Sequence, residues 1–323
     1  MNAKSQANSP ANSLASWPEL PTAAWRESCE TLHLWTQIVG KVRLTLSPWL
    51  NHSWHVTLYV TSRGLSTSPI PDGTRNFEIE FDFIDHTLRI STSDGMGREF
   101  ILAGHSVASF YAKLLAELAD LGIHVKINET PNELPDAIKF PQDTVHSSYD
   151  PDAVRRFFQI LVNCDRVFKQ FRTGFIGKAS PVHFFWGSFD LALTRFSGRR
   201  APLHPGGVPN LPNAVACEAY SHEVSSAGFW PGGGAIDYPA FYSYAYPEPP
   251  GFRATKVRPD AAFFSEALGE FVLPYDAVRS ADDPDQALLA FLQSTYEAAA
   301  VAAKWDRESL ECALGKPCAV RKI

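Results

Sequence analysis

The stretch that most constrains the fold runs from Pro181 to Arg199, with the sequence PVHFFWGSFDLALTRFSGR. It combines five aromatic residues with a histidine, an aspartate and two arginines in an otherwise apolar run. Because successive side chains of a strand point to opposite faces, one face here is apolar and carries Phe189, Leu191 and Leu193. The opposite face carries Trp186, Ser188, Asp190 and Thr194. We therefore predict a strand with one apolar and one polar, aromatic face, around which the rest of the chain is organised.

Asp190 is the polar residue whose burial in this strand would cost most. A buried carboxylate has to be paired, or it has to take up a proton. Arg195 falls on the opposite face by alternation, so it is not an automatic partner. Asp190 could serve as a general acid or base in a pocket, or it could hold loop backbone as a purely structural residue.

Periodicity and turn residues predict the other elements. Apolar residues at helical spacing, preceded by capping residues, favour helices at 22–41, 106–121, 151–174 and 284–306. Alternating patterns between Gly, Pro and Asp turns favour strands at 55–62, 77–84, 87–93, 98–102, 123–127, 218–229, 239–246 and 268–273.

The order of these elements predicts an α+β protein with two similar halves. Each half consists of an antiparallel sheet with flanking helices. The predicted organisation is a disordered tail (1–16), a first half (17–128), a linker (129–149), a second half (150–311) and a tail (312–323), packed as one globular unit. The strings at 58–61 (LYVT) and 191–194 (LALT) suggest an internal duplication, although strand composition alone also explains them.

Polar residues at buried or strand positions make up the candidate site. His33 and Gln37 lie four apart on a helix that is apolar nearly all round, so both need buried hydrogen-bond partners. His55 and Tyr59 share the polar face of the strand predicted at 55–62. If the two halves face each other, these side chains and Asp190 line a cleft between them. The candidate catalytic residues are Asp190, Glu223, His183 and His222, and the candidate ligand-binding residues are His33, Gln37, His55, Tyr59, Trp186, Arg195 and Trp230.

Several kinds of site lack support in the sequence. The histidines match no metal-binding spacing such as HExxH, so no metal site is predicted. There is no GxSxG nucleophile motif, and no motif identifies a cofactor. A net charge of −6 without a run of Lys or Arg argues against nucleic acid and membranes as partners.

The location of the protein is predicted from what targeting segments require. Residues 1–16 lack the apolar segment of a signal peptide, and no apolar run approaches the roughly 20 residues that span a bilayer. Five widely spaced cysteines without a CxxC motif do not indicate a disulfide framework. We therefore expect a soluble, cytoplasmic protein.

Long strings distributed over the chain resemble one bacterial family, which is known only as a domain of unknown function. The strings are TLHLWTQIVGKVRL (31–44), HVTLYVTSRGLSTSPIP (55–71), SPVHFFWGSFDLALTRFSGR (180–199), YSHEVSSAGFWPGG (220–233) and FLQSTYEAAA (291–300). The resemblance spans about residues 17–311 and implies a single full-length unit. It brings no activity, cofactor or catalytic residue.

Two functions remain open on the sequence. The first is a small-molecule-binding protein, or an enzyme that hydrolyses or isomerises a polar metabolite, with an aromatic-lined polar cleft between the halves. The second is a protein-interaction or homodimeric protein that presents the Pro-rich loops 201–212 and 247–259, with Trp230 or Tyr242 as exposed anchors.

Overall fold

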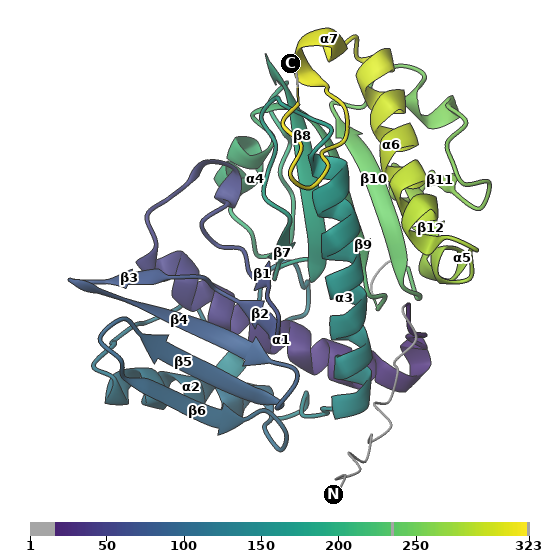
Figure 1. Cartoon of the computed structure of the whole chain (residues 1–323). Helices are drawn as coiled ribbons and strands as arrows, with labels where there is room; N and C mark the ends of the chain where they lie inside the picture. Colours follow the sequence, from purple (N-terminus) through teal and green to yellow (C-terminus); the bar gives the residue numbers. More distant parts are fainter. Residues whose placement is uncertain (1–16, 234–235, 322–323) are drawn as a thin grey trace, which may run out of the picture.

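The chain folds as an α+β protein with two antiparallel sheets of six strands each. The structure, a computed structural model, describes residues 17–233 and 236–321 (Figure 1). The tail predicted at 1–16 therefore lies outside the described residues. The predicted fold class is confirmed, because each half pairs one antiparallel sheet with helices.

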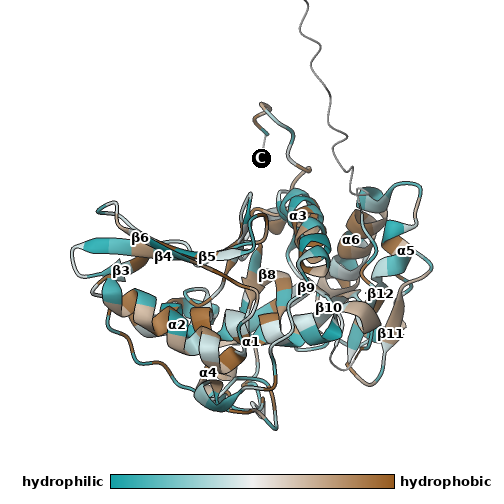
Figure 2. Ribbon diagram, turned by 90° about the horizontal axis from the view of Figure 1, so that it is seen from below, coloured by the Kyte–Doolittle hydropathy of each residue, from teal (hydrophilic) through white to brown (hydrophobic). Residues whose placement is uncertain are grey.

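The first half is built around helix α1 and the first sheet. Its elements are α1 (Thr22–Leu46), β1 (Tyr59–Val60), β2 (Gly64–Ser66), β3 (Ile70–Asp72), β4 (Arg75–Asp82), β5 (Thr87–Thr92), β6 (Gly97–Ile101) and α2 (Val107–Asp120). The strand order is β1-β2-β4-β5-β6, and β3 also pairs with β4. Phe81 on β4 and Phe100 on β6 meet Phe110 of α2 with ring centroids 6.1 and 5.6 Å apart. Helix α2 thus covers the apolar face that the alternation in β4 predicts (Figure 2).

The second half also combines one antiparallel sheet with helices, and its strands β8 and β9 are the longest of the described strands. Its elements are α3 (Pro151–Arg172), β7 (His183–Phe185), β8 (Asp190–Arg200), α4 (Asn213–Ala219), β9 (His222–Trp230), β10 (Ala240–Tyr246), β11 (Phe263–Ser265), β12 (Glu270–Pro274), α5 (Tyr275–Arg279), α6 (Pro284–Ala302) and α7 (Arg307–Leu310). The strand order is β11-β12-β10-β9-β8-β7. Asp150 and Asp283 cap α3 and α6 by accepting backbone N–H groups, which explains why these helices begin where the sequence predicts.

The two faces of the second sheet have different covers. Helices α3 and α6 lie on one side and α4 lies on the other (Figure 2). The register places Leu191 opposite Phe229, and Phe229 opposite Phe241, on one face of the sheet. All three side chains are buried, and Phe241 contacts Phe168 of α3 with ring centroids 6.5 Å apart. The face under α3 and α6 is therefore hydrophobic core, and the opposite face is left to smaller cover segments.

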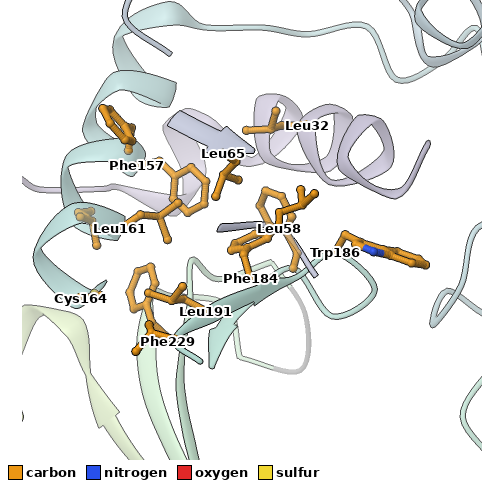
Figure 3. Close-up of a cluster of buried hydrophobic side chains, with 14 of the residues drawn as sticks. Leu32, Leu58, Leu65, Phe157, Leu161, Cys164, Phe184, Trp186, Leu191 and Phe229 are labelled. Carbon is orange, nitrogen blue, oxygen red and sulfur yellow. The ribbon is translucent and has the colours of Figure 1, made fainter. Parts of the chain in front are cut away.

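The two halves share a continuous core. The backbones of Leu58 and Phe184 exchange two hydrogen bonds, of 2.9 and 2.7 Å, and so join the first sheet to β7. Figure 3 shows Leu58 and Phe184 side by side between Leu32 of α1 and Leu161 of α3. None of these four side chains is exposed. The seam between the halves is therefore packed with apolar side chains in the same way as the interior of each half.

Four predicted strands differ in the structure. The strand predicted at 218–229 begins only at His222, because Glu218 and Ala219 belong to helix α4. Residues 123–127 form no strand, and Ile123 and Ile127 are buried loop residues. The strand predicted at 55–62 shrinks to Tyr59–Val60, because the chain turns through residues 51–55. The stretch 181–199 is two strands joined by a turn, since Phe189 has φ 57°, which a regular strand cannot accommodate.

The segment predicted as a linker is packed against both halves. Phe140 is fully buried, and the Tyr149 ring lies 5.7 Å from that of Trp35 on α1. Residues 312–321 also contact the body, as Cys312 N–H donates to Gly174 O at 3.2 Å. The strings used to predict a duplication lie in non-equivalent strands, because β1 is an edge strand and β8 is an interior one. The duplication itself stays a prediction.

Candidate functional site

Small side chains on two interior strands leave a cavity on the face of the second sheet opposite α3 and α6. The register aligns Ala192 with Gly228, and Thr194 with Ser226, across β8 and β9. None of these side chains rises far above the sheet. The cavity that they leave has a volume of about 480 Å³, the size of a small-molecule site. We call it the sheet pocket.

Aromatic residues from both halves form the walls of the sheet pocket. The first half contributes the end of α1 and the segment 49–56 that follows it, and the loop between the halves contributes residues 132–133. The second half contributes β7 to β10, β12, α4 and the loop before α4. The lining rings are Trp49, Trp54, Phe185, Trp186, Phe196, Tyr220, Trp230, Tyr242 and Tyr244. Trp230 and Tyr242 lie against each other, with ring centroids 4.4 Å apart.

Asp190 lies on the floor of the sheet pocket and is 4% exposed. Its carboxyl group accepts a hydrogen bond from the Tyr242 hydroxyl, which reaches it from β10 across β9. Tyr242 can lie over β9 because Gly228 has no side chain there, and a Cβ at that position would overlap the Tyr242 ring. Gly228 thus makes the contact between Asp190 and Tyr242 sterically possible.

Glu133 brings a second carboxyl group from the loop between the two halves. Ser188 Oγ donates to Glu133 Oε2 at 2.6 Å, and Glu133 N–H donates to Pro209 O at 2.8 Å. A Cβ on Gly187 would overlap the Glu133 carboxyl group, so glycine at this position admits the acid. Burial raises the pKa of Glu133. Burial, opposed by the Tyr242 hydrogen bond and reinforced by the nearby Glu133, raises the pKa of Asp190 to about 7.

Glu270, at the start of β12, provides a third carboxyl group. Burial, together with repulsion from Asp190, raises the pKa of Glu270 to about 8. Its Oε2 atom is buried and has no hydrogen-bond partner among the described residues. Within those same residues, no group of three His, Cys, Asp or Glu side chains could hold a metal ion. The three carboxyl groups therefore line one cavity without forming a metal centre.

A histidine and a lysine mark the opposite end of the sheet pocket. His52 lines the cavity, its Nδ1 donates to Ala219 O at 2.9 Å, and its Nε2 lies 2.6 Å from Lys178 Nζ. Burial lowers the pKa of His52, so its ring is neutral and Nε2 accepts from the ammonium group. The Lys178 ammonium group also lies over the rings of Trp54 and Phe196, at 5.4 and 4.8 Å.

His33 and Gln37 hold loops of the site and do not line the cavity. His33 Nε2 lies 2.8 Å from Gly187 O, and burial lowers its pKa to about 4, so the ring stays neutral. Gln37 donates to Asn132 O and accepts from Asn132 N–H, at 3.0 and 2.8 Å. The two residues thereby position the backbone beside Ser188 and Glu133. The expected partners are loop backbone groups and, at 3.0 Å between Gln37 Nε2 and His33 Nε2, the two side chains themselves.

Of the other predicted ligand-binding residues, only the tryptophans line the sheet pocket. Trp186 is buried and donates from Nε1 to Val56 O at 2.7 Å, and Trp230 stacks on Tyr242. His55 accepts from Leu50 N–H and supports the rim loop from outside. The Tyr59 ring lies under the Arg43 guanidinium group, 5.3 Å away, outside the cavity.

Arg195 and three of the predicted catalytic residues also lie outside the sheet pocket. Arg195 is buried on the opposite face of the sheet, with its guanidinium group 3.5 Å from the Phe171 ring centroid. Burial lowers the pKa of His183 to about 3, and this ring packs on Phe185. Glu223 pairs with Arg199 at 2.6 Å, beside a smaller cavity of about 300 Å³, and His222 contacts Ser221. Asp190 is thus the only predicted catalytic residue among those that line the sheet pocket.

Sequence reasoning missed Glu133, Glu270 and the role of Tyr242. The alternation of tyrosines in YSYAY (242–246) places Tyr242 and Tyr244 on one face of β10 and could have indicated a lined surface. Glu133 lies in a loop without periodicity, and nothing in its surrounding sequence indicates burial.

The fold and this cavity define an α+β protein with an acidic, aromatic pocket on one face of its second sheet. The chain belongs to a family of unknown function, DUF5996, whose model matches residues 17–312. No curated protein and no solved structure matches the chain. Among the described residues, no helix is long and apolar enough to cross a membrane.

Proposed function

We propose that this protein binds a small polar molecule in the sheet pocket and that Asp190 is its central recognition group. The observation that carries the proposal is a buried carboxyl group on the floor of a 480 Å³ cavity walled by aromatic rings. Burying a carboxyl group costs free energy that an apolar side chain would not cost, and acids buried in a cavity occur preferentially at functional sites.

The same carboxyl groups suit acid–base chemistry on a bound molecule. Burial raises the pKa of Asp190 to about 7 and that of Glu270 to about 8, so each can take up or release a proton near neutral pH. If the protein is an enzyme, hydrolysis or isomerisation of a polar metabolite is the chemistry that these groups support. Asp190 would then be the proton-transfer residue and Tyr242 its positioning residue.

The alternative, a protein-interaction or homodimeric protein, has less support. Its expected anchors, Trp230 and Tyr242, line the sheet pocket, and Tyr242 is only 4% exposed. The exposed residues Trp49 and Leu50 adjoin the pocket rim, and Trp49 itself lines the cavity. Oligomeric state measured with and without ligand would reveal an interface there.

A cytoplasmic location is also part of the proposal. All five cysteines are free, as befits a reducing compartment, and Cys318 is exposed. Fractionation of cells that express the full-length chain tests this location, and recovery of the chain in a membrane or secreted fraction would contradict it.

Filling the sheet pocket tests the proposed function. The Ala192→Phe variant places a ring on the pocket floor and should abolish the thermal stabilisation that a hit from a library of polar metabolites gives the wild type. Ala119→Phe, on the exposed surface of α2, is the matched control and should respond as the wild type does. A hit that stabilises both variants equally would show that the ligand binds elsewhere, and a library without hits would count against the proposal.

A further inference from the structure

The three carboxyl groups of the sheet pocket have no countercharge. Asp190, Glu133 and Glu270 form no ion pair among the described residues, whereas Glu223 and many surface acids are paired with arginine. The partners of Asp190 and Glu133 are neutral hydroxyl groups, and Glu270 Oε2 has none. We refer to this part of the cavity as the acidic end.

Lysine and arginine are absent from the described residues that line the cavity. Two ammonium groups lie close to lining residues, and both are engaged. Lys41 Nζ donates to Thr130 O at 2.8 Å, and Lys178 Nζ contacts His52 at the opposite end. A ligand therefore meets acidic and aromatic groups at the acidic end, with no protein cation among the lining residues there.

Aromatic rings flank the acidic end and add to its preference for positive charge. Trp230 and Tyr242 have ring centroids 4.4 Å apart, and Tyr242 and Tyr244 have centroids 6.1 Å apart at an interplanar angle of 16°. The face of an aromatic ring carries negative charge density and attracts cations, ammonium groups in particular. Among the described residues no group of three His, Cys, Asp or Glu side chains could hold a metal ion, and rings beside carboxyl groups suit an organic cation.

We propose that the sheet pocket takes an organic ammonium cation, held by Asp190, Glu133 and Glu270 beside the rings of Trp230, Tyr242 and Tyr244. The inference rests on the proposed function and specifies its ligand class. The cation supplies the positive charge that the acidic end lacks, since Lys178 lies at the opposite end of the cavity, and its alkyl groups cover the rings.

Binding is coupled to proton release, with a sign that follows from the site. The titratable groups that line the cavity are Asp190, Glu133, Glu270, His52, Tyr220, Tyr242 and Tyr244. In the empty pocket, burial raises the pKa of all three acids, and a cation favours their ionised forms. Affinity for a cation therefore rises as the pH rises through about 7 to 8. An anion shows the reverse dependence, and a neutral ligand shows little.

Three probes of nearly the same shape test the inference: choline, 3,3-dimethylbutan-1-ol and 3,3-dimethylbutanoate. Choline carries a quaternary ammonium cation, the alcohol has a neutral carbon in its place, and 3,3-dimethylbutanoate carries an anionic carboxylate group. Calorimetry or the fluorescence of the lining tryptophans measures the affinity of each at about pH 6 and about pH 8. We expect choline to bind at least about tenfold more tightly than the neutral alcohol at the higher pH, a difference of about 1.4 kcal/mol. We also expect choline to weaken at the lower pH.

Variants assign the preference to the acidic end. Glu270→Gln should weaken choline binding about tenfold or more and leave the affinity of the alcohol unchanged. Glu266→Gln, on an exposed residue of the same segment, is the matched control and should change neither affinity.

Several outcomes would overturn the ligand class. If the alcohol or the butanoate binds as tightly as choline, or if the affinity of choline does not depend on pH, the inference is wrong. The three probes could also fail while neutral or anionic compounds of the library bind. If Ala192→Phe then abolishes the binding of those compounds, the proposed function stands without this inference. If no compound binds, both are wrong.

Discussion

At the scale of single residues, Asp190 combines deep burial with a raised pKa in the sheet pocket. Asp190 is buried beside a tyrosine hydroxyl, with two further acids lining the same cavity, and burial raises its pKa to about 7. Unfolding returns Asp190 to water, where its pKa is near 3.8. The unfolded chain thus loses this proton at lower pH than the folded chain does.

This difference predicts a pH-dependent effect of Asp190→Asn on stability. Between about pH 4 and pH 7 the folded state binds more protons at this site, so the wild type loses stability as the pH rises. Asparagine does not titrate and can still accept from Tyr242. Relative to the wild type, the unfolding free energy of the variant should increase by on the order of 2 kcal/mol between about pH 5 and about pH 8. Urea unfolding at both pH values measures the gain, and an unchanged difference would show that Asp190 does not titrate in this range.

At the scale of elements, the second sheet makes the site by alternating large and small side chains on one face. Ala192, Ser226 and Gly228 keep the middle of that face low, while Tyr242 and Trp230 rise beside it. The opposite face carries large apolar side chains such as Leu191 and Phe229, and α3 and α6 pack on them. A cavity on one face and a core on the other follow from the same strands.

The glycine in β9 gives this description a direct test. In Gly228→Ala the new Cβ would overlap the Tyr242 ring, so Tyr242 moves away from Asp190. We expect a loss of about 1–3 kcal/mol in unfolding free energy from the overpacking. Since the Tyr242 hydrogen bond lowers the pKa of Asp190, we also expect that pKa to rise further.

Infrared spectroscopy measures the pKa of Asp190 in this variant. The carboxyl band of Asp190 is identified by its loss in Asp190→Asn, and its intensity is followed as the pH changes. Tyr242→Phe removes the same hydroxyl group without a clash and should raise the same pKa with less loss of stability. A pKa of Asp190 that is unchanged in both variants would exclude the hydrogen bond.

At the scale of the whole molecule, the two halves depend on each other. The sheet pocket takes residues 49–56 from the first half, and the backbone bridge between Leu58 and Phe184 holds this segment beside β7. Glu133 reaches the cavity because Gln37 of α1 binds the adjacent Asn132 at both backbone groups. The pocket can therefore form only when both halves have folded and docked.

This dependence predicts one unfolding transition for the described unit. Leu58→Ala should lower the unfolding free energy by about 2–5 kcal/mol, because Leu58 is fully buried at the seam and leaves a cavity there. Tryptophan fluorescence and far-UV circular dichroism should report the same midpoint for the wild type and the variant. Two separated midpoints would mean that the halves are independently stable domains.

The sequence by itself determined the fold class, the capped starts of α3 and α6, and the alternating faces of β4 and β8. These features are local, because caps and periodicity act within a few residues of the chain. From alternation it also placed Trp186, Ser188, Asp190 and Thr194 on one face, and all four line the sheet pocket even though a turn interrupts the strand.

Which polar residues lie together in the sheet pocket depends on the tertiary structure. A loop and two other strands bring Glu133, Glu270 and Tyr242 close to Asp190. Residue spacing in the sequence does not show that Gly187 and Gly228 leave room for Glu133 and Tyr242. His33, His183 and Arg195 have the residue types of a site, yet each is held by backbone or aromatic neighbours outside the cavity. The physical reason is that burial and electrostatic coupling depend on distances between segments far apart in the chain, and side-chain packing sets those distances.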